Sequence, residues 1–176
     1  MPSRRWPADR NLAFSLRPAT ADDRQGVDAL LAVSYPLLMA EAYGPLLVEL
    51  LPFIAKANPA LLTSGRYFLV EGGNGAVVAA GGWSPERPGT GDLEAGLGHI
   101  RHFVTHPDYA GRGLGAFLFD VCRAMAEQQE VRRFDCYASL NAVGFYGRIG
   151  FTALRPMDVP ITPQLAMPAC LMRFGT

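Results

Sequence analysis

Cysteine is scarce in this chain of 176 residues, and neither sign of charge is in excess. The three cysteines are Cys122, Cys136 and Cys170, and no two of them form a CxxC pair. This usage fits a reducing cytoplasm in which the thiols act as small core residues. Lys+Arg and Asp+Glu both number 16, so the formal net charge is +0. A balanced chain lacks the basic field that general binding to nucleic acid or to a membrane surface requires, and we expect neither partner.

Long apolar runs are missing as well. No stretch approaches the roughly 20 apolar residues needed to span a bilayer. The charged residues 1–10 are followed by no apolar region of the kind that marks a secretory signal. Hydrophobic residues make up 49% of the chain against 18% charged, which argues against disorder. We therefore expect one domain over residues 1–176, with residues 1–12 as a flexible N-terminal extension.

Apolar periodicity and chain breakers indicate an α+β domain with a mixed sheet, in the order β-α-α-β-β-β-α-β-α-β-β. Two strand-like runs flank Asn74-Gly75, the strongest short signal for a hairpin. Pro36 is expected to end the first helix, and Pro52 to interrupt or bend the second. The predicted strands are 14–17, the two arms of a hairpin over 66–83, 99–104, 132–139, 154–159 and 169–174. The predicted helices follow Thr20, Pro45, Gly113 and Asn141, the last one stopping at Gly150.

Three glycines lie in the stretch HPDYAGRGLGAFLF, residues 106–119, where a strand gives way to an apolar helix pattern. Glycine at this density lets the backbone approach a ligand. A P-loop is excluded because no Lys-Ser/Thr pair follows the glycines. Gly111, Gly113 and Ala116 satisfy G-x-G-x-x-A, but residues 105–110 separate them from the strand, which argues against a dinucleotide. A coenzyme A pyrophosphate and a purely geometric turn remain as the two interpretations.

The C-terminal half of the chain resembles the GNAT superfamily of acetyl-CoA-dependent N-acetyltransferases. IRHFVTHPDYAGRGLGAFLF is similar to the family's V-x-P strand exit followed by Q/R-x-x-G-x-G/A, with Gly113 and Gly115 on the glycine positions. The family's N…FY…GF segment is matched by Asn141, Phe145, Tyr146, Gly150 and Phe151. Ala110 departs from the family's Gln or Arg. The resemblance spans about residues 66–174 and implies a mostly antiparallel sheet flanked by helices.

The resemblance also implies a set of contacts with coenzyme A. Backbone groups of Phe103 and Val104 would hold the pantetheine arm like an added strand, and a backbone N–H there would stabilise the oxyanion. N–H groups that open the helix would hold the pyrophosphate, with Arg112 adding charge. Tyr146 is the implied general acid for the leaving thiolate. The implied set is Phe103, Val104, Gly111, Arg112, Gly113, Leu114, Gly115, Ala116, Asn141 and Tyr146.

The identity of the general base is open from the sequence. His99 aligns with the family's frequent strand glutamate, and an imidazole with a pKa of about 6.5 suits deprotonation of an ammonium. Glu94 on the preceding loop is the runner-up, His102 reads equally well as a structural histidine, and a reaction without a protein base is a further alternative. Strand alternation places His99 and His102 on opposite faces, which disfavours a metal ion shared with His106, and we expect no metal.

The implied reaction is transfer of an acetyl group from acetyl-CoA to a primary amine, by direct attack in a ternary complex. The stretch VSYPLLMAEAYGP supplies Tyr35, Met39 and Tyr43 with one acid, Glu41, so we expect a small, partly apolar acceptor. The same residues could instead be core or dimer contacts. Because of the departures at Ala110 and His99, a non-catalytic acyl-CoA-binding regulatory module is the alternative function. The resemblance also allows a homodimer.

Overall fold

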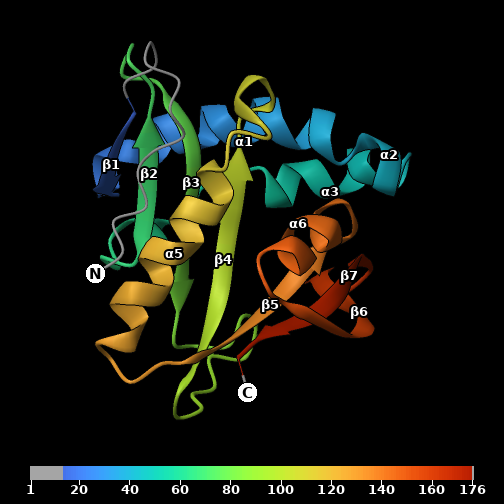
Figure 1. The fold of residues 1–176 in the computed structure, drawn as a ribbon. Coiled ribbons are helices and arrows are strands. Elements are labelled where there is room, and N and C mark those ends of the chain that lie inside the picture. The colour runs from blue at the N-terminus through green and yellow to red at the C-terminus, as the bar shows by residue number, and fades with distance from the viewer. Residues whose placement is uncertain (1–13, 176) are drawn as a thin grey trace.

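The computed structural model describes residues 14–175, in which seven strands form one sheet in the order β1-β2-β3-β4-β5-β7-β6 (Figure 1). The segment 1–12, expected to be an extension, lies outside the described residues. The strands are β1 (Ser15–Pro18), β2 (Tyr67–Glu71), β3 (Val77–Ser84), β4 (Leu97–Thr105), β5 (Arg133–Ser139), β6 (Thr152–Thr162) and β7 (Leu165–Phe174). Within the described chain only β4 and β5 pair in parallel. The predicted class, a mixed and mostly antiparallel sheet with helices, is confirmed.

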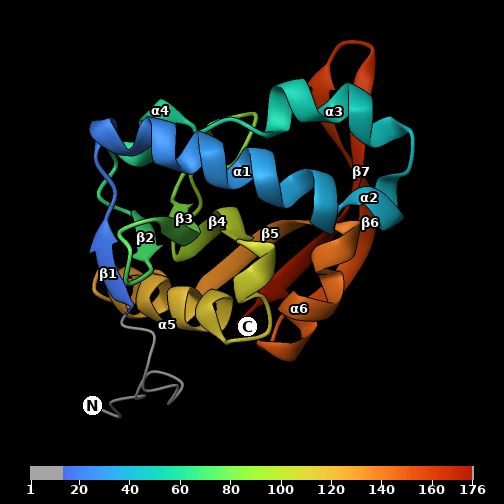
Figure 2. The same cartoon turned by 90° about the horizontal axis from the view of Figure 1, so that it is seen from above.

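Helices cover both faces of the sheet, as the view from above shows (Figure 2). One face carries α1 (Arg24–Leu38), α3 (Leu46–Ile54) and α4 (Pro59–Leu62), with α2 (Ala40–Tyr43) between α1 and α3 along the chain. The other face carries α5 (Leu114–Glu127) and α6 (Val143–Arg148). Each layer buries its own apolar cluster, one around Leu118 and Phe134 under α5 and one around Leu31 and Leu69 under α1. The sheet is therefore the middle of three layers, with an apolar cluster buried on each of its faces.

The two helices with internal proline differ from the sequence expectation. α1 does not end at Pro36 but continues to Leu38, and the N–H of Met39 still donates to the carbonyl of Tyr35 at 3.0 Å. Pro52 likewise lies inside α3, which is one helix. A proline has no N–H to donate to the carbonyl of residue i−4. In the last turn of a helix few backbone hydrogen bonds follow the proline, so the helix can continue past it. The expected end of the helix at Pro36 is therefore wrong, because the helix continues to Leu38.

The predicted hairpin and the predicted helix after Gly113 are confirmed. β2 and β3 pair antiparallel around the turn at Asn74-Gly75. α5 begins at Leu114 and buries Leu118 and Cys122 from its apolar stripe. Neither α2 nor α4 was predicted, although Asn58 caps α4 by accepting from the N–H groups of Ala60 and Leu61, at 3.0 and 3.3 Å. An Asn-Pro pair is a recognisable helix start, so α4 had a usable signal.

The sheet splits between β4 and β5 (Figure 1). These strands pair only where residues 97–99 face residues 133–135, and beyond that point they diverge. Just above the split β4 bulges, because Ala80 pairs with Val104 whereas Gly82 pairs with Arg101, which leaves one extra residue on β4. At the bulge His102 takes a φ of 47°, a conformation that non-glycine residues rarely adopt.

The bulge breaks the alternation that we expected along this strand. Ile100 and Phe103 both pack into the cluster under α5, whereas Val104 packs under α1. Gly81 lies opposite the bulge, and a Cβ there would stand 2.6 Å from the Phe103 ring. The period of two holds only where strands match residue for residue, so one inserted residue reverses the faces that follow it.

Candidate active site

A cavity of about 830 Å³ occupies the split between β4 and β5. Its walls come from α1, α3, the bulged part of β4, the glycine loop, β5, α6 and the β6–β7 hairpin. Pockets of this size hold small molecules and cofactors. Segments that are far apart in the sequence therefore meet at one place.

The glycine loop presents backbone to this cavity. Gly111 and Gly113 have φ values of 75° and 82°, which favour glycine. A Cβ built on either would meet none of the described atoms within 4 Å, so the loop is open on that side. At Gly115 close packing requires glycine, because a Cβ there would stand 2.8 Å from the Phe145 ring of α6. Gly113 caps α5 without a side-chain hydrogen bond, which leaves the first N–H groups of α5 for a ligand.

The Arg112 side chain does not line the cavity but contacts Tyr109, which does. Its Nη2 donates to the carbonyl of Asp108 at 3.3 Å, and its guanidinium lies over the Tyr109 ring at 5.2 Å from the ring centroid. Arg112 is not among the lining residues, although Gly111 and Gly113 on either side of it are. In this arrangement the loop offers N–H groups rather than a cation.

Tyr146 is buried at the inner end of the cavity with 5% of its surface exposed. Its ring packs against Phe103, Phe145 and Phe151, with centroids 6.4, 5.0 and 5.2 Å away. Its hydroxyl shares a hydrogen bond with the thiol of Cys136. Burial raises the pKa of Tyr146 well above its usual value and raises the pKa of Cys136 to about 12. Both groups therefore keep their protons at neutral pH.

The structure separates the two candidate histidines. His99 is 2% exposed, lies beside Asp135 in the ladder, and does not line the cavity. His102 does line it, and burial lowers the pKa of His102 to about 4, so its imidazole is neutral. The Tyr67 hydroxyl donates to the carbonyl of His102 at 2.9 Å and holds the bulge in place. Glu94 lies outside the cavity wall and pairs with Arg133 at 3.0 Å.

The expected acceptor residues are also divided. Tyr35 and Met39 line the cavity, but Tyr43 does not. The Tyr43 hydroxyl donates to the carbonyl of Pro168 at 2.7 Å and accepts from the N–H of Leu140 at 3.0 Å, which ties α2 to the far end of the sheet. The wall also contains apolar residues that the sequence did not single out, among them Leu38, Phe53, Ile54, Val159, Ile161 and Met167. No Asp or Glu of the described chain lines this cavity.

Most of the residues proposed from the sequence do meet here. Those that line the cavity are Phe103, Val104, Gly111, Gly113, Leu114, Gly115, Ala116, Asn141 and Tyr146, together with Tyr35 and Met39. His99, Arg112 and Tyr43 lie outside the wall. Residues 14–175 contain no group of three or more His, Cys, Asp or Glu that could hold a metal ion. No helix in the same range is long and apolar enough to cross a membrane.

Residues 64–159 match the sequence model of the acetyltransferase (GNAT) domain, and this is more than half of the chain. The chain belongs to the GNAT family. It is accordingly an acyltransferase of the N-acetyltransferase type. The matched part of the GNAT domain begins before β2 and ends within β6, so it includes the bulge, the glycine loop and α6.

Solved GNAT structures share the fold at low sequence identity. A GCN5-related N-acetyltransferase from Rhodopseudomonas palustris is 22% identical with a TM-score of 0.70, covering 92% of this chain and 95% of that one. The PaiA N-acetyltransferase from Thermoplasma acidophilum, solved with coenzyme A, is 12% identical with a TM-score of 0.68, covering 93% and 99%. N-acetylglutamate synthase from Neisseria gonorrhoeae, complexed with coenzyme A and N-acetyl-glutamate, is 14% identical with a TM-score of 0.62, covering 92% and 35%.

The neutral state of His102 in this GNAT domain predicts a loss of stability in acid. Its pKa is about 4 when folded and about 6.5 when unfolded, so between these values the unfolded chain binds more protons. Stability is therefore expected to fall as the pH drops through this window, by about 3 kcal/mol from His102 alone. Urea unfolding of wild type and His102→Asn across the window measures this, since asparagine tolerates a positive φ. Parallel pH profiles for the two proteins would contradict the assignment.

Proposed function

We propose that this chain transfers an acetyl group from acetyl-CoA to a primary amine on a small, largely apolar acceptor. The observation that carries the proposal is one cavity that joins the N–H groups of the glycine loop to an apolar wall, with Tyr146 and His102 on its lining. Attack of the amine on the thioester carbonyl within a ternary complex needs these features on one path.

The coenzyme A end of the cavity rests on backbone groups. Gly111 and Gly113 leave open space beside the first N–H groups of α5, where a pyrophosphate fits. Phe103 and Val104 lie where β4 has no partner on its β5 side, so their amide groups can pair with the amides of the pantetheine arm. Asn141 lines the same wall in the turn before α6. Arg112 lies over the ring of Tyr109, which lines the cavity, and can add positive charge beside it.

The chemistry of the transfer needs one group that accepts a proton and one that gives a proton. In the proposed step the amine nitrogen bonds to the carbonyl carbon, and the carbon–sulfur bond breaks as the tetrahedral intermediate collapses. We assign acceptance of the amine proton to His102 rather than His99, because His102 is neutral and lines the cavity. Tyr146 keeps its proton until thiolate character develops on sulfur, and it then donates that proton.

The acceptor class follows from the far wall. It is lined by Leu38, Phe53, Ile54 and Met167. Among the described residues, no Asp or Glu lines this cavity, so no carboxylate on its wall would attract a second positive charge. A cationic peptide tail would need an acidic groove to offset its desolvation. We therefore expect an amine on an aromatic or branched aliphatic body.

An acceptor screen with acetyl-CoA and mass-spectrometric detection tests the proposal. Monoamines with an aromatic or branched aliphatic body are expected to react with kcat/KM at least about tenfold above polyamines and lysine-rich peptides, since each buried CH₂ adds to transition-state binding. A reaction without protein measures background aminolysis. Acetylation confined to lysine-rich peptides would contradict the acceptor class.

A non-catalytic acyl-CoA-binding module is the second candidate, and the observation behind it is how the burial of Tyr146 and His102 shifts their pKa values. A tyrosine with a raised pKa is a weak acid, and a histidine with a pKa of about 4 is a weak base. Calorimetric binding of acetyl-CoA with no turnover over the whole amine panel would support this candidate.

A cytoplasmic location completes the proposal, because Cys122, Cys136 and Cys170 are all free thiols. One domain over 1–176 and a homodimer stay expectations.

A further inference from the structure

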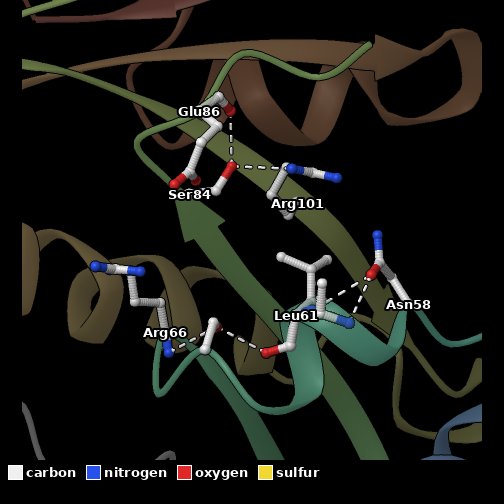
Figure 3. A pocket seen from close by; sticks show the side chains of 8 residues that line it. Asn58, Leu61, Arg66, Ser84, Glu86 and Arg101 are labelled. Atoms are coloured by element: carbon white, nitrogen blue, oxygen red, sulfur yellow. Dashed lines mark hydrogen bonds between the residues drawn. The ribbon is translucent and has the colours of Figure 1, made fainter. Parts of the chain in front are cut away.

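A second cavity, of about 340 Å³, lies between α4, the end of β3 and the middle of β4 (Figure 3). Its lining consists of Asn58, Ala60, Leu61, Ser64, Arg66, Ser84, Glu86 and Arg101. None of these residues lines the cavity at the sheet split. It is therefore a separate site, and its lining combines two arginines, Arg66 and Arg101, with one acid, Glu86.

Arg101 supplies a partly buried guanidinium that forms no salt bridge within residues 14–175, although the Glu86 carboxylate of the same cavity acts on it electrostatically. Its Nη1 donates to Ser84 Oγ at 2.9 Å, and Ser84 Oγ in turn donates to the carbonyl of Glu86 at 2.8 Å. The serine hydroxyl is thus fixed as an acceptor toward Arg101. Among residues 14–175, no carboxylate oxygen lies within 4.0 Å of the Arg101 guanidinium. The donors that Ser84 does not use are available to a ligand.

Asn58 supplies a second donor with a fixed direction. Its Oδ1 accepts from the N–H groups of Ala60 and Leu61, so the helix cap holds the amide and turns its NH₂ end away from the helix backbone. Figure 3 shows this nitrogen on the side of the cavity to which the Arg101 guanidinium extends. Nδ2 donates to no acceptor in the part of the chain that the structure describes. One guanidinium and one carboxamide donor on the same side are the groups that recognise a carboxylate.

The remaining residues set the charge and the shape of the ligand. Arg66 and Arg101 are cations and Glu86 is an acid, so the lining carries one net positive charge. Arg66 is held over the Trp83 ring, 5.4 Å from its centroid, so it contributes charge from the opposite side. Leu61 adds an apolar surface. A ligand with one negative charge balances the net charge of the lining, whereas a second negative charge would be repelled by the Glu86 carboxylate.

We propose that this cavity binds a small monocarboxylate, with the carboxylate between Arg101 and Asn58 and a short apolar body against Leu61. The site does not depend on the acyl-transfer reaction, because the two cavities have no lining residue in common.

Titration with sodium butyrate, followed by NMR at constant ionic strength with sodium chloride as reference, tests the proposal. Saturable shifts of the Asn58 side-chain NH₂ are expected in the wild type. Asn58→Asp is the sharpest variant, because aspartate still caps α4 but replaces the donor by a negative oxygen. Arg101→Gln removes the charge, and each variant is expected to weaken butyrate binding by about tenfold or more.

Two matched controls repeat these substitutions elsewhere. Asn74→Asp changes an amide whose Oδ1 likewise accepts a backbone N–H, in the β2–β3 turn, and Arg155→Gln removes an exposed cation. Both are expected to bind butyrate like the wild type. Absence of saturable shifts in the wild type, or undiminished binding by Asn58→Asp, overturns the proposal. Tighter binding of inorganic phosphate than of butyrate near neutral pH overturns the monocarboxylate class.

Discussion

Tyr146→Phe is expected to lower kcat for acetyl transfer by about 10²- to 10⁴-fold, the range for loss of a general acid. The substitution removes only the hydroxyl, and its partner in the resting protein is the Cys136 thiol. The packing against Phe103, Phe145 and Phe151 stays in place. Affinity for acetyl-CoA is therefore expected to change little, so the loss should be in kcat. Steady-state kinetics with the best amine of the screen, together with calorimetry, measures both quantities.

Tyr43→Phe is the matched control for this experiment. Its hydroxyl makes two hydrogen bonds outside the cavity, to the carbonyl of Pro168 and from the N–H of Leu140. Removing it should cost about 1 kcal/mol of unfolding free energy while leaving kcat near the wild-type value. If Tyr146→Phe kept the wild-type kcat, the proton would come from another donor. A loss of kcat in both variants would indicate a general disturbance of the fold.

Phe134→Ala is expected to lower the free energy of unfolding by about 3–5 kcal/mol. Phe134 is fully buried on β5 and packs edge-on against Trp83 and Phe119, with centroids 6.2 and 5.7 Å away. A Cβ on Gly98 would stand 3.0 Å from its ring, so sheet backbone closes around it. Surroundings of this kind cannot collapse into the space of the lost ring, and the cavity term adds to the transfer term. Urea unfolding gives the value.

Phe53→Ala separates this effect from the general loss of an aromatic ring. Phe53 is 54% exposed at the rim of the large cavity, so its removal should cost less than about 1 kcal/mol. Equal destabilisation by both substitutions would contradict the assignment of the core. A large effect of Phe53→Ala on acceptor KM alone would agree with its place in the cavity wall.

The residues proposed to bind coenzyme A are the ones that the sequence could bring together in advance. Those of the glycine loop are close in sequence, since Gly111, Gly113 and Gly115 open a helix whose apolar stripe can be read directly. The acceptor wall was not predictable, because Phe53 and Met167 lie on elements that only tertiary packing brings together. Met39 was proposed because the stretch VSYPLLMAEAYGP contains it, and it does line the cavity.

The two candidate bases show what strand alternation leaves out. Alternation assigns faces by counting residues along β4, and the bulge at His102 adds a residue that the count does not include. Nothing in HIRHFV signals a positive φ, since Gly81, whose missing side chain leaves room for Phe103, is on the neighbouring strand. Arg112 is a different case, because its guanidinium lies over the ring of Tyr109, a contact that the sequence does not indicate.

The split in the sheet also bears on aggregation. A seven-stranded sheet normally presents two outer edges, and here both are poor templates for another chain. β1 has four residues and ends in Pro18, while β6 contains Pro156 and Pro160. The divergence of β4 and β5 creates two more edges, but these face inward between the helical layers (Figure 2). Unpaired backbone is thus hidden from other proteins and remains open to a slender ligand with amide groups of its own.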